Sequence, residues 1–157
     1  MKNNGLRIVN DFDYIILDRI MEDNQNIIDS GMCWNENYIT LDDIRSGIAN
    51  RIEEQTEQYK PHYYKHETFK SDEWHIGRVI YFVNNPDMIT PIDITADIYS
   101  NRYKCIQKTN VSIDDGHHRL IAHLILGNKI IKAYYSGRCD LLDYLTGQTD
   151  KKPIEWV

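Results

Sequence analysis

Apolar residues spaced three and four positions apart predict several amphipathic helices along this chain. One apolar stripe follows Thr40 and consists of Leu41, Ile44, Ile48 and Ile52. Thr40 is the expected N-cap of this helix, because the carboxylate of Asp43 follows three residues later. We expect the helix to continue to about residue 59 and to stop before Pro61.

The same spacing recurs in four other segments. Near the start of the chain the apolar positions are Phe12, Ile15, Ile16, Ile20 and Ile27. A glycine, Gly31, provides a stop for the first of these helices, and Gly127 provides one for a later helix. We expect helices over about residues 11–30, 76–83, 117–126 and 141–145.

Short runs of β-branched and aromatic residues between these helices predict strands. They fall at residues 6–9, 91–95, 99–106, 110–113 and 129–135. Helices and strands are therefore intermixed, which predicts an α+β fold with helices packed on a small mixed sheet. The 157 residues suit a single domain that spans residues 1–157.

One junction between a predicted strand and a predicted helix concentrates polar chemistry. It reads Ile113-Asp114-Asp115-Gly116-His117-His118-Arg119-Leu120-Ile121-Ala122. Helix N–H groups, a glycine and cationic side chains meet there, which is the arrangement that binds an anion such as phosphate. Gly116 lets the backbone approach a ligand, and Arg119 offers a planar fork that matches phosphate oxygens.

The remaining polar residues of this junction have candidate roles of their own. His118 can donate a hydrogen bond to the phosphate and gains charge near pH 6 to 7, and His117 is the candidate general acid or base. Asp115, with Asp93 of the preceding strand, is a candidate ligand of Mg²⁺. Aspartate is equally an ordinary helix cap, so both roles stay open for Asp115. Adjacent helical residues point about 100° apart, so we expect one of the two histidines to be structural.

Two further features of the sequence each allow two interpretations. His123 lies one turn beyond Arg119 and either lines the site or is a half-exposed helix residue. The basic, aromatic stretch at residues 60–78 suggests a surface for a nucleotide or single strand. Because acidic residues dilute its charge, we favour a loop whose aromatic side chains anchor it to the core.

The composition of the chain limits the classes of partner that we expect it to bind. A protein with a formal net charge of −6 does not bind duplex DNA through its overall field and would need a local basic patch. No apolar run is long enough to cross a bilayer, and no apolar signal core follows the first residues. Three widely separated cysteines, Cys33, Cys105 and Cys139, favour reduced thiols. We therefore expect a cytoplasmic protein that contacts no membrane.

The junction resembles the phosphate-binding box of the ParB/sulfiredoxin superfamily. The resemblance rests on residues 115–122, on Gly127 and on the strand at 130–135, with looser similarity at 78–83 and 91–94. It covers about residues 74–147, whereas residues 1–70 resemble nothing recognisable and are expected to form a helical N-terminal extension. The resemblance implies a small α+β domain that binds ATP or another nucleoside phosphate with Mg²⁺ at this helix start.

Differences between this chain and the family pattern indicate which of the family's activities to expect here. Sulfiredoxin has its working cysteine where this chain has His117, so thiol repair by that route is not expected. The partition proteins carry Gly-Glu-Arg-Arg where residues 116–119 read Gly-His-His-Arg. The branch that phosphorylates free serine shares Asp-Gly-His-His-Arg, but its catalytic glutamate has no single counterpart here. Short stand-alone members of this kind also occur in phages and mobile elements.

Three functions remain open on these grounds. The first is an Mg²⁺-dependent enzyme that hydrolyses a nucleoside triphosphate or transfers its phosphate. The second is a module that binds a nucleotide or phosphorylated small molecule without turnover and thereby regulates contact with a protein partner. The third is a metal-dependent nuclease, which the acidic composition disfavours.

Overall fold

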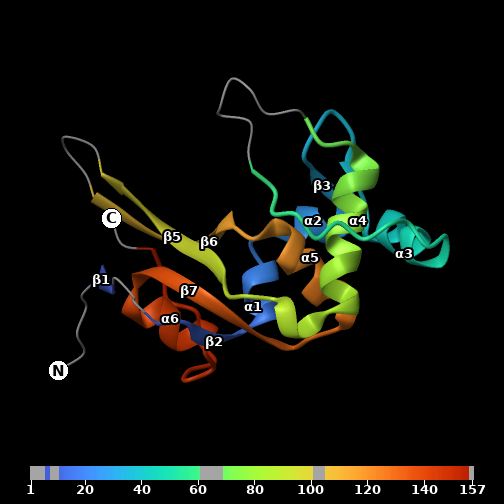
Figure 1. The fold of residues 1–157 in the computed structure, drawn as a ribbon. Coiled ribbons are helices and arrows are strands. Elements are labelled where there is room, and N and C mark those ends of the chain that lie inside the picture. The colour runs from blue at the N-terminus through green and yellow to red at the C-terminus, as the bar shows by residue number, and fades with distance from the viewer. Residues whose placement is uncertain (1–5, 8–10, 61–68, 101–104, 156–157) are drawn as a thin grey trace. The chain divides into compact units, whose positions relative to one another are not determined.

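The computed structural model describes residues 6–7, 11–60, 69–100 and 105–155, and it shows an α+β fold (Figure 1). Its contacts cluster into two compact units that interleave along the chain. The first, called the sheet unit below, consists of Met1–Gln25, Thr90–Gly116 and Asn128–Val157. The second, called the helical unit, consists of Asn26–Ile89 and His117–Gly127.

The sheet unit is built on a mixed sheet of four strands. In spatial order they are β2 (Asp13–Ile16), β7 (Ile130–Arg138), β5 (Ile92–Ser100) and β6 (Cys105–Asp115). The pair β5–β7 is parallel and the other pairs are antiparallel. A two-residue strand, β1 (Leu6–Arg7), extends the sheet by pairing with the end of β7. The predicted strands at 91–95 and 129–135 are therefore confirmed, and 110–113 belongs to the longer β6.

One face of this sheet carries the core of the unit. Burial alternates along β7, where Ile131, Ala133 and Tyr135 are buried and the residues between them are exposed. Two short helices, α1 (Leu17–Met21) and α6 (Cys139–Leu145), complete the core. Their fully buried side chains are Ile20, Leu141 and Leu145. This alternation with period two is what a sheet with one dry face requires.

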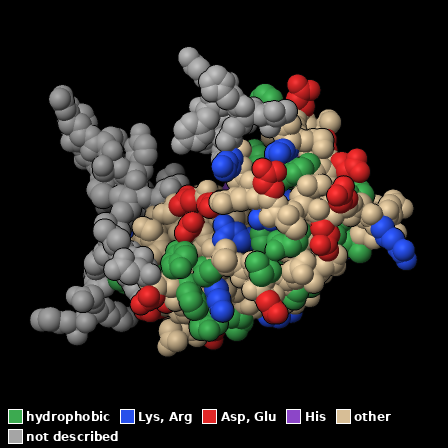
Figure 2. Space-filling view, viewed as in Figure 1, with side chains coloured by type: hydrophobic (Ala, Val, Ile, Leu, Met, Phe, Trp, Pro, Cys, Tyr) green, Lys and Arg blue, Asp and Glu red, His purple; other side chains and the backbone are tan. Residues whose placement is uncertain are grey.

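The opposite face of β2 and β7 exposes large apolar side chains. Phe12, Tyr14, Ile130 and Tyr134 are 37%, 61%, 57% and 38% exposed. Tyr14 pairs directly with Lys132, whose Nζ lies 5.2 Å from the centre of the Phe12 ring. Green side chains around a blue one mark this patch in Figure 2. Clusters of this kind commonly mark interaction surfaces.

The helical unit packs three longer helices together. They are α3 (Leu41–Ala49), α4 (Asp72–Asn84) and α5 (His117–Leu126), and α4 contacts both of the others. A short helix α2 (Gln25–Ser30), a hairpin of β3 (Met32–Cys33) and β4 (Tyr38–Ile39), and the 3₁₀ turn η1 (Pro86–Met88) complete it. Buried core residues come from all three long helices and include Ile44, Val79, Ile80, Leu120 and Ile121.

Two predicted helices are wrong in extent. The helix expected over 11–30 begins as strand β2, because Ile15 and Ile16 pair with Ile131 and Ile130 of β7, and only α1 and α2 remain helical. The helix expected over 41–59 ends at Ala49, since Asn50 caps it and Arg51 adopts a positive φ of 53°. The strand expected at 99–106 falls partly on residues 101–104, which lie outside the described residues.

The N-cap of α3 is confirmed. Asp43 N–H donates to Thr40 Oγ1 at 3.1 Å, and Thr40 N–H donates to Asp43 Oδ2 at 2.8 Å. This reciprocal pair is a capping box, which satisfies two N–H groups that the helix itself leaves without acceptors.

Thr40→Ala is therefore expected to lower the free energy of unfolding by about 1 kcal/mol. Urea denaturation of the variant and the parent measures this difference. The exposed Thr56, which follows α3 and caps no helix, provides the matched control as Thr56→Ala. An equal loss in both variants would contradict a capping role for Thr40.

Among the described helices, none combines the length and the apolar character that a membrane span demands.

Candidate anion-binding site

The start of α5 has the backbone expected of an anion site. Gly116, the residue before α5, is buried and has a φ of 103°. Residues other than glycine rarely adopt this backbone conformation. The helix then begins at His117 and runs for ten residues, so the predicted start and end are both confirmed. Every α-helix leaves the N–H groups of its first turn without acceptors inside the helix and carries partial positive charge there.

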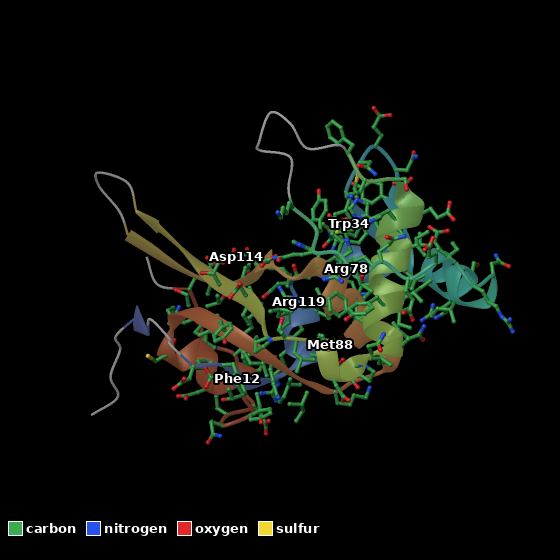
Figure 3. The ribbon with its side chains drawn as sticks, in the orientation of Figure 1. Phe12, Trp34, Arg78, Met88, Asp114 and Arg119 are labelled. Carbon is green, nitrogen blue, oxygen red and sulfur yellow. The ribbon has the colours of Figure 1, made fainter. Side chains whose placement is uncertain are left out.

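Two arginines of the helical unit lie near this first turn. Arg119 is the third residue of α5, and Arg78 comes from the middle of α4, which packs against α5. The guanidinium of Arg78 lies 4.4 Å from the centre of the Phe82 ring, and its Nη1 donates to Gln55 O at 3.1 Å. That bond uses one of the five N–H donors of Arg78. Figure 3 labels both arginines.

The charges of Arg78 and Arg119 affect each other. The pKa of Arg78 is lowered mainly by burial, and the positive charge of Arg119 lowers it further, while Tyr81 opposes both effects. Like charges repel each other, and an anion bound beside both guanidiniums would be attracted by each. The pair is therefore an electrostatic reason for an anion to bind at this end of α5.

His118 lies in a hydrogen-bonded pair of imidazoles. Its Nε2 is 2.9 Å from His75 Nδ1, and the two rings are nearly coplanar at 11°. The indole of Trp34 stacks on both rings, with centroid distances of 4.7 Å to His75 and 4.4 Å to His118. Tyr59 and Trp74 contact the pair edge-on. We call these five side chains the aromatic cluster.

Burial keeps both imidazoles of this pair neutral. His75 is fully buried, which lowers its pKa to about 4 although Asp72 opposes the shift. Burial also lowers the pKa of His118 well below its usual range, and His75, Arg78, His117 and Arg119 add to the effect. His118 therefore does not gain charge near pH 6 to 7 as the sequence suggested. Any bond that it gives to a phosphate comes from a neutral ring.

The buried pair has one unsatisfied atom. His75 Nε2 is buried and has no hydrogen-bond partner among the described residues. One nitrogen of the Nδ1–Nε2 contact donates and the other accepts, so the tautomers of the two rings are coupled. A buried nitrogen of this kind can form a hydrogen bond with a water molecule or with a polar atom of a ligand.

The two other histidines of α5 differ in exposure. His117, the first residue of α5, is half-buried, so of the adjacent pair it is the one with more exposure to solvent. His123 is buried rather than half-exposed, and its pKa falls to about 4 because of burial and the charge of Arg119. The structure thus supports the expectation that one histidine of the adjacent pair is structural, and it places His118 in that role.

The candidate magnesium ligands lie in the sheet unit. Asp93 of β5 is the cross-strand partner of Asp115 of β6, so their side chains share one face of the sheet. The register skips Asp114, which marks a β-bulge immediately before Gly116. Among the described residues no group of three metal-ligating side chains occurs. Two carboxylates on one sheet face are nevertheless ligands of the kind that Mg²⁺ takes, together with water.

The basic and aromatic stretch at 60–78 is only partly described, since residues 61–68 lie outside the described residues. Within the described part, Tyr59 and Trp74 pack on the buried histidines, and His75 is itself buried. Sequence reasoning missed Trp34 altogether, because no local pattern connects it to a helix start more than eighty residues later. It also did not foresee that His75 bonds His118.

Comparisons with protein-family models, with curated proteins and with solved structures found no match to this chain.

Proposed function

We propose that the protein binds the phosphates of a nucleoside phosphate at the first turn of α5. The observation that carries this proposal is the start of α5, which Gly116 introduces with a positive φ, together with two arginines of the helical unit, Arg78 and Arg119, whose charges both act on His118. Guanidinium groups bind phosphate through two parallel N–H bonds, and the helix start adds N–H groups aligned with its dipole. The ParB/sulfiredoxin resemblance, with its sulfiredoxin-like fold, points to the same ligand.

We further propose that bound nucleotide is hydrolysed or donates its phosphate. His117 would act as general acid or base, since it is the more exposed of the adjacent histidines. Asp115 is the second proposed catalytic residue, and Asp115 and Asp93, whose side chains share one face of the sheet, are the proposed ligands of Mg²⁺. That ion would offset the charge that develops during phosphoryl transfer.

A binding module without turnover is the second candidate. The exposed apolar patch around Phe12, Tyr14 and Tyr134 supports it, because such a patch suits contact with a protein partner. Release of inorganic phosphate from ATP by the purified protein distinguishes the two candidates. Release that Arg119→Ala abolishes supports the enzyme, and binding without release supports the module.

Arg119→Ala is expected to weaken nucleotide binding by about 10- to 100-fold, because a charge-assisted hydrogen bond contributes about 1.5–3 kcal/mol. Isothermal titration calorimetry with ATP, ADP, CTP and GTP, each with and without Mg²⁺, measures the effect. Asp93→Asn and Asp115→Asn in the same titration should remove any gain that Mg²⁺ gives.

The matched control for Arg119→Ala is Arg45→Ala. Arg45 is an exposed arginine of α3 that pairs with Asp42, so its loss removes the same charge from a position outside α5. Binding that falls equally in both variants would show only an effect of overall charge. No binding of any nucleotide by the parent protein would overturn the proposal.

A further inference from the structure

We propose that Trp34 binds the base of the ligand by stacking, so that the site selects a nucleoside phosphate over a phosphosugar or inorganic phosphate. This inference rests on the proposed function, since it takes the phosphates to lie at Arg78 and Arg119. Three observations support the inference. They are the hydrogen bonds around Trp34, the rings that stack on its indole, and its contact with the first turn of α5.

Polar bonds of the two neighbouring residues restrain Trp34 at the hairpin between β3 and β4. Asn35 Nδ2, on the next residue, donates to Lys70 O at 2.8 Å and to Asp72 Oδ1 at 3.0 Å. On the other side, Cys33 Sγ donates to Asn35 O at 3.0 Å. The hairpin is thereby tied to the start of α4. A side chain positioned before the ligand arrives loses little conformational entropy on binding.

Two imidazole rings of the fold stack on the Trp34 indole. The rings of His75 and His118 lie side by side under it, at interplanar angles of 6° and 11°. Among the described residues these imidazoles are the two rings that stack on Trp34. Trp34 is nevertheless half-buried rather than buried, so the residue keeps some surface accessible to solvent. An accessible aromatic surface is what a planar base needs for stacking.

The stacking surface is close to the cations. His118 touches Trp34 at a centroid distance of 4.4 Å, and it immediately precedes Arg119 in α5. The charges of Arg78 and Arg119 both act on the His118 ring. Figure 3 shows Trp34, Arg78 and Arg119 one after another within the helical unit. A ligand with phosphates at one end and a planar ring at the other matches this order of side chains.

The test compares ligands with and without a base. The parent protein and Trp34→Leu are titrated with ATP, GTP, CTP and UTP and with inorganic tripolyphosphate, all with Mg²⁺. We expect the parent to bind at least one nucleotide about 10-fold or more tightly than tripolyphosphate, the scale of stacking on one aromatic side chain. In Trp34→Leu that preference should disappear while tripolyphosphate binds as before. Trp74→Leu is the matched control and should keep the preference, because Trp74 contacts the histidines edge-on.

The outcomes separate this inference from the proposed function. Equal affinity of the parent for nucleotides and tripolyphosphate overturns stacking but leaves phosphate binding intact. A preference that survives in Trp34→Leu likewise overturns it, and so does equal loss of both ligand types. No binding of any ligand by the parent overturns the proposed function and this inference together.

A second measurement does not depend on the stability of Trp34→Leu. The chain has three tryptophans, Trp34, Trp74 and Trp156, so Trp74→Phe with Trp156→Phe leaves Trp34 as the sole indole fluorophore. We expect the preferred nucleotide to quench its emission and tripolyphosphate to leave it unchanged. Identical emission with saturating nucleotide would overturn the inference.

Discussion

Acidification from pH 7.5 to 5.5 is expected to lower the free energy of unfolding by up to about 4 kcal/mol. Three buried histidines of the helical unit, His75, His118 and His123, have pKa values below the 6.5 of an exposed histidine. Burial is the largest cause in each case. One pKa unit corresponds to about 1.4 kcal/mol per group, so three groups that remain neutral one unit below 6.5 give this total as an upper value.

The sign follows from proton uptake. Below pH 6.5 the unfolded chain binds protons at these three histidines, whereas the folded chain does not. The contribution of these three neutral histidines to the free energy of unfolding is therefore fully present above pH 6.5 and is lost as the pH falls. The loss continues to about pH 4, where His75 and His123 also become charged in the folded state. Since small domains have only about 5–15 kcal/mol of stability, we expect unfolding in mild acid.

Urea denaturation at pH 7.5, 6.5 and 5.5 measures this dependence before most carboxylates titrate. The variant His123→Leu removes one of the three groups and keeps an apolar side chain of similar size. Its loss of stability over the same range should be smaller by about a third. The same pH dependence in His123→Leu and the parent would contradict the assignment of His123, and no pH dependence in the parent would contradict all three.

The parts of the fold that the sequence predicted well are those with local signals. Helix α5 lies between Gly116 and Gly127, which both adopt positive φ, and the capping box at Thr40 starts α3. Each of these signals lies within a few residues of the feature it specifies. Alternating polar and apolar residues likewise located β7, whose buried and exposed positions follow the pleat of the sheet.

The wrong predictions concern interactions between distant parts of the chain. Ile15 and Ile16 fit a helical stripe, but their partners in β7 lie about 115 residues away and make them a strand. The end of α3 was misplaced because residues 52–60 leave the helix and lie along α4. Local periodicity cannot report either pairing, because tertiary contacts override propensity.

The candidate site likewise combines a feature with a local sequence signal and a feature that depends on distant residues. The helix start at residues 116–119 is a local motif, and its conformation is confirmed. The burial of His118 depends on His75 and Trp34, which lie 43 and 84 residues earlier and which no spacing rule connects to it. A histidine that looks suited to binding phosphate as a cation is therefore neutral because of neighbours that only the fold brings together.

Gly77→Ala is expected to destabilise the protein by about 1–3 kcal/mol, although alanine is the better helix former by about 1 kcal/mol. Gly77 lies inside α4, and a Cβ there would come 2.2 Å from Glu53 O and 3.1 Å from Gln55 Cγ. The backbone of this segment lies directly on the helix, since Gln55 N–H donates to Gly77 O at 3.1 Å. An added methyl group must therefore push backbone away, which a rotamer change cannot avoid.

The same substitution should weaken ligand binding. Gln55 O accepts the hydrogen bond from Arg78 Nη1 at 3.1 Å, so moving this segment removes the contact that orients Arg78. Urea denaturation measures the stability, and titration with the preferred nucleotide measures the affinity at a temperature where the variant is folded. We expect both to fall, because one segment supports the packing of α4 and the position of its arginine.

Gly47→Ala in α3 is the matched control. The three atoms nearest to a Cβ at Gly47 would belong to side chains: Ile76 Cγ2 at 2.5 Å, Ile52 Cδ1 at 3.3 Å and Ile80 Cδ1 at 3.3 Å. Side-chain atoms yield more readily than the backbone carbonyl that a Cβ at Gly77 would meet, so this variant should lose less stability than Gly77→Ala and should keep more of its affinity. Equal losses in the two variants would mean that residues 53–55 can shift without cost, and the position of Arg78 would then not depend on the close approach at Gly77.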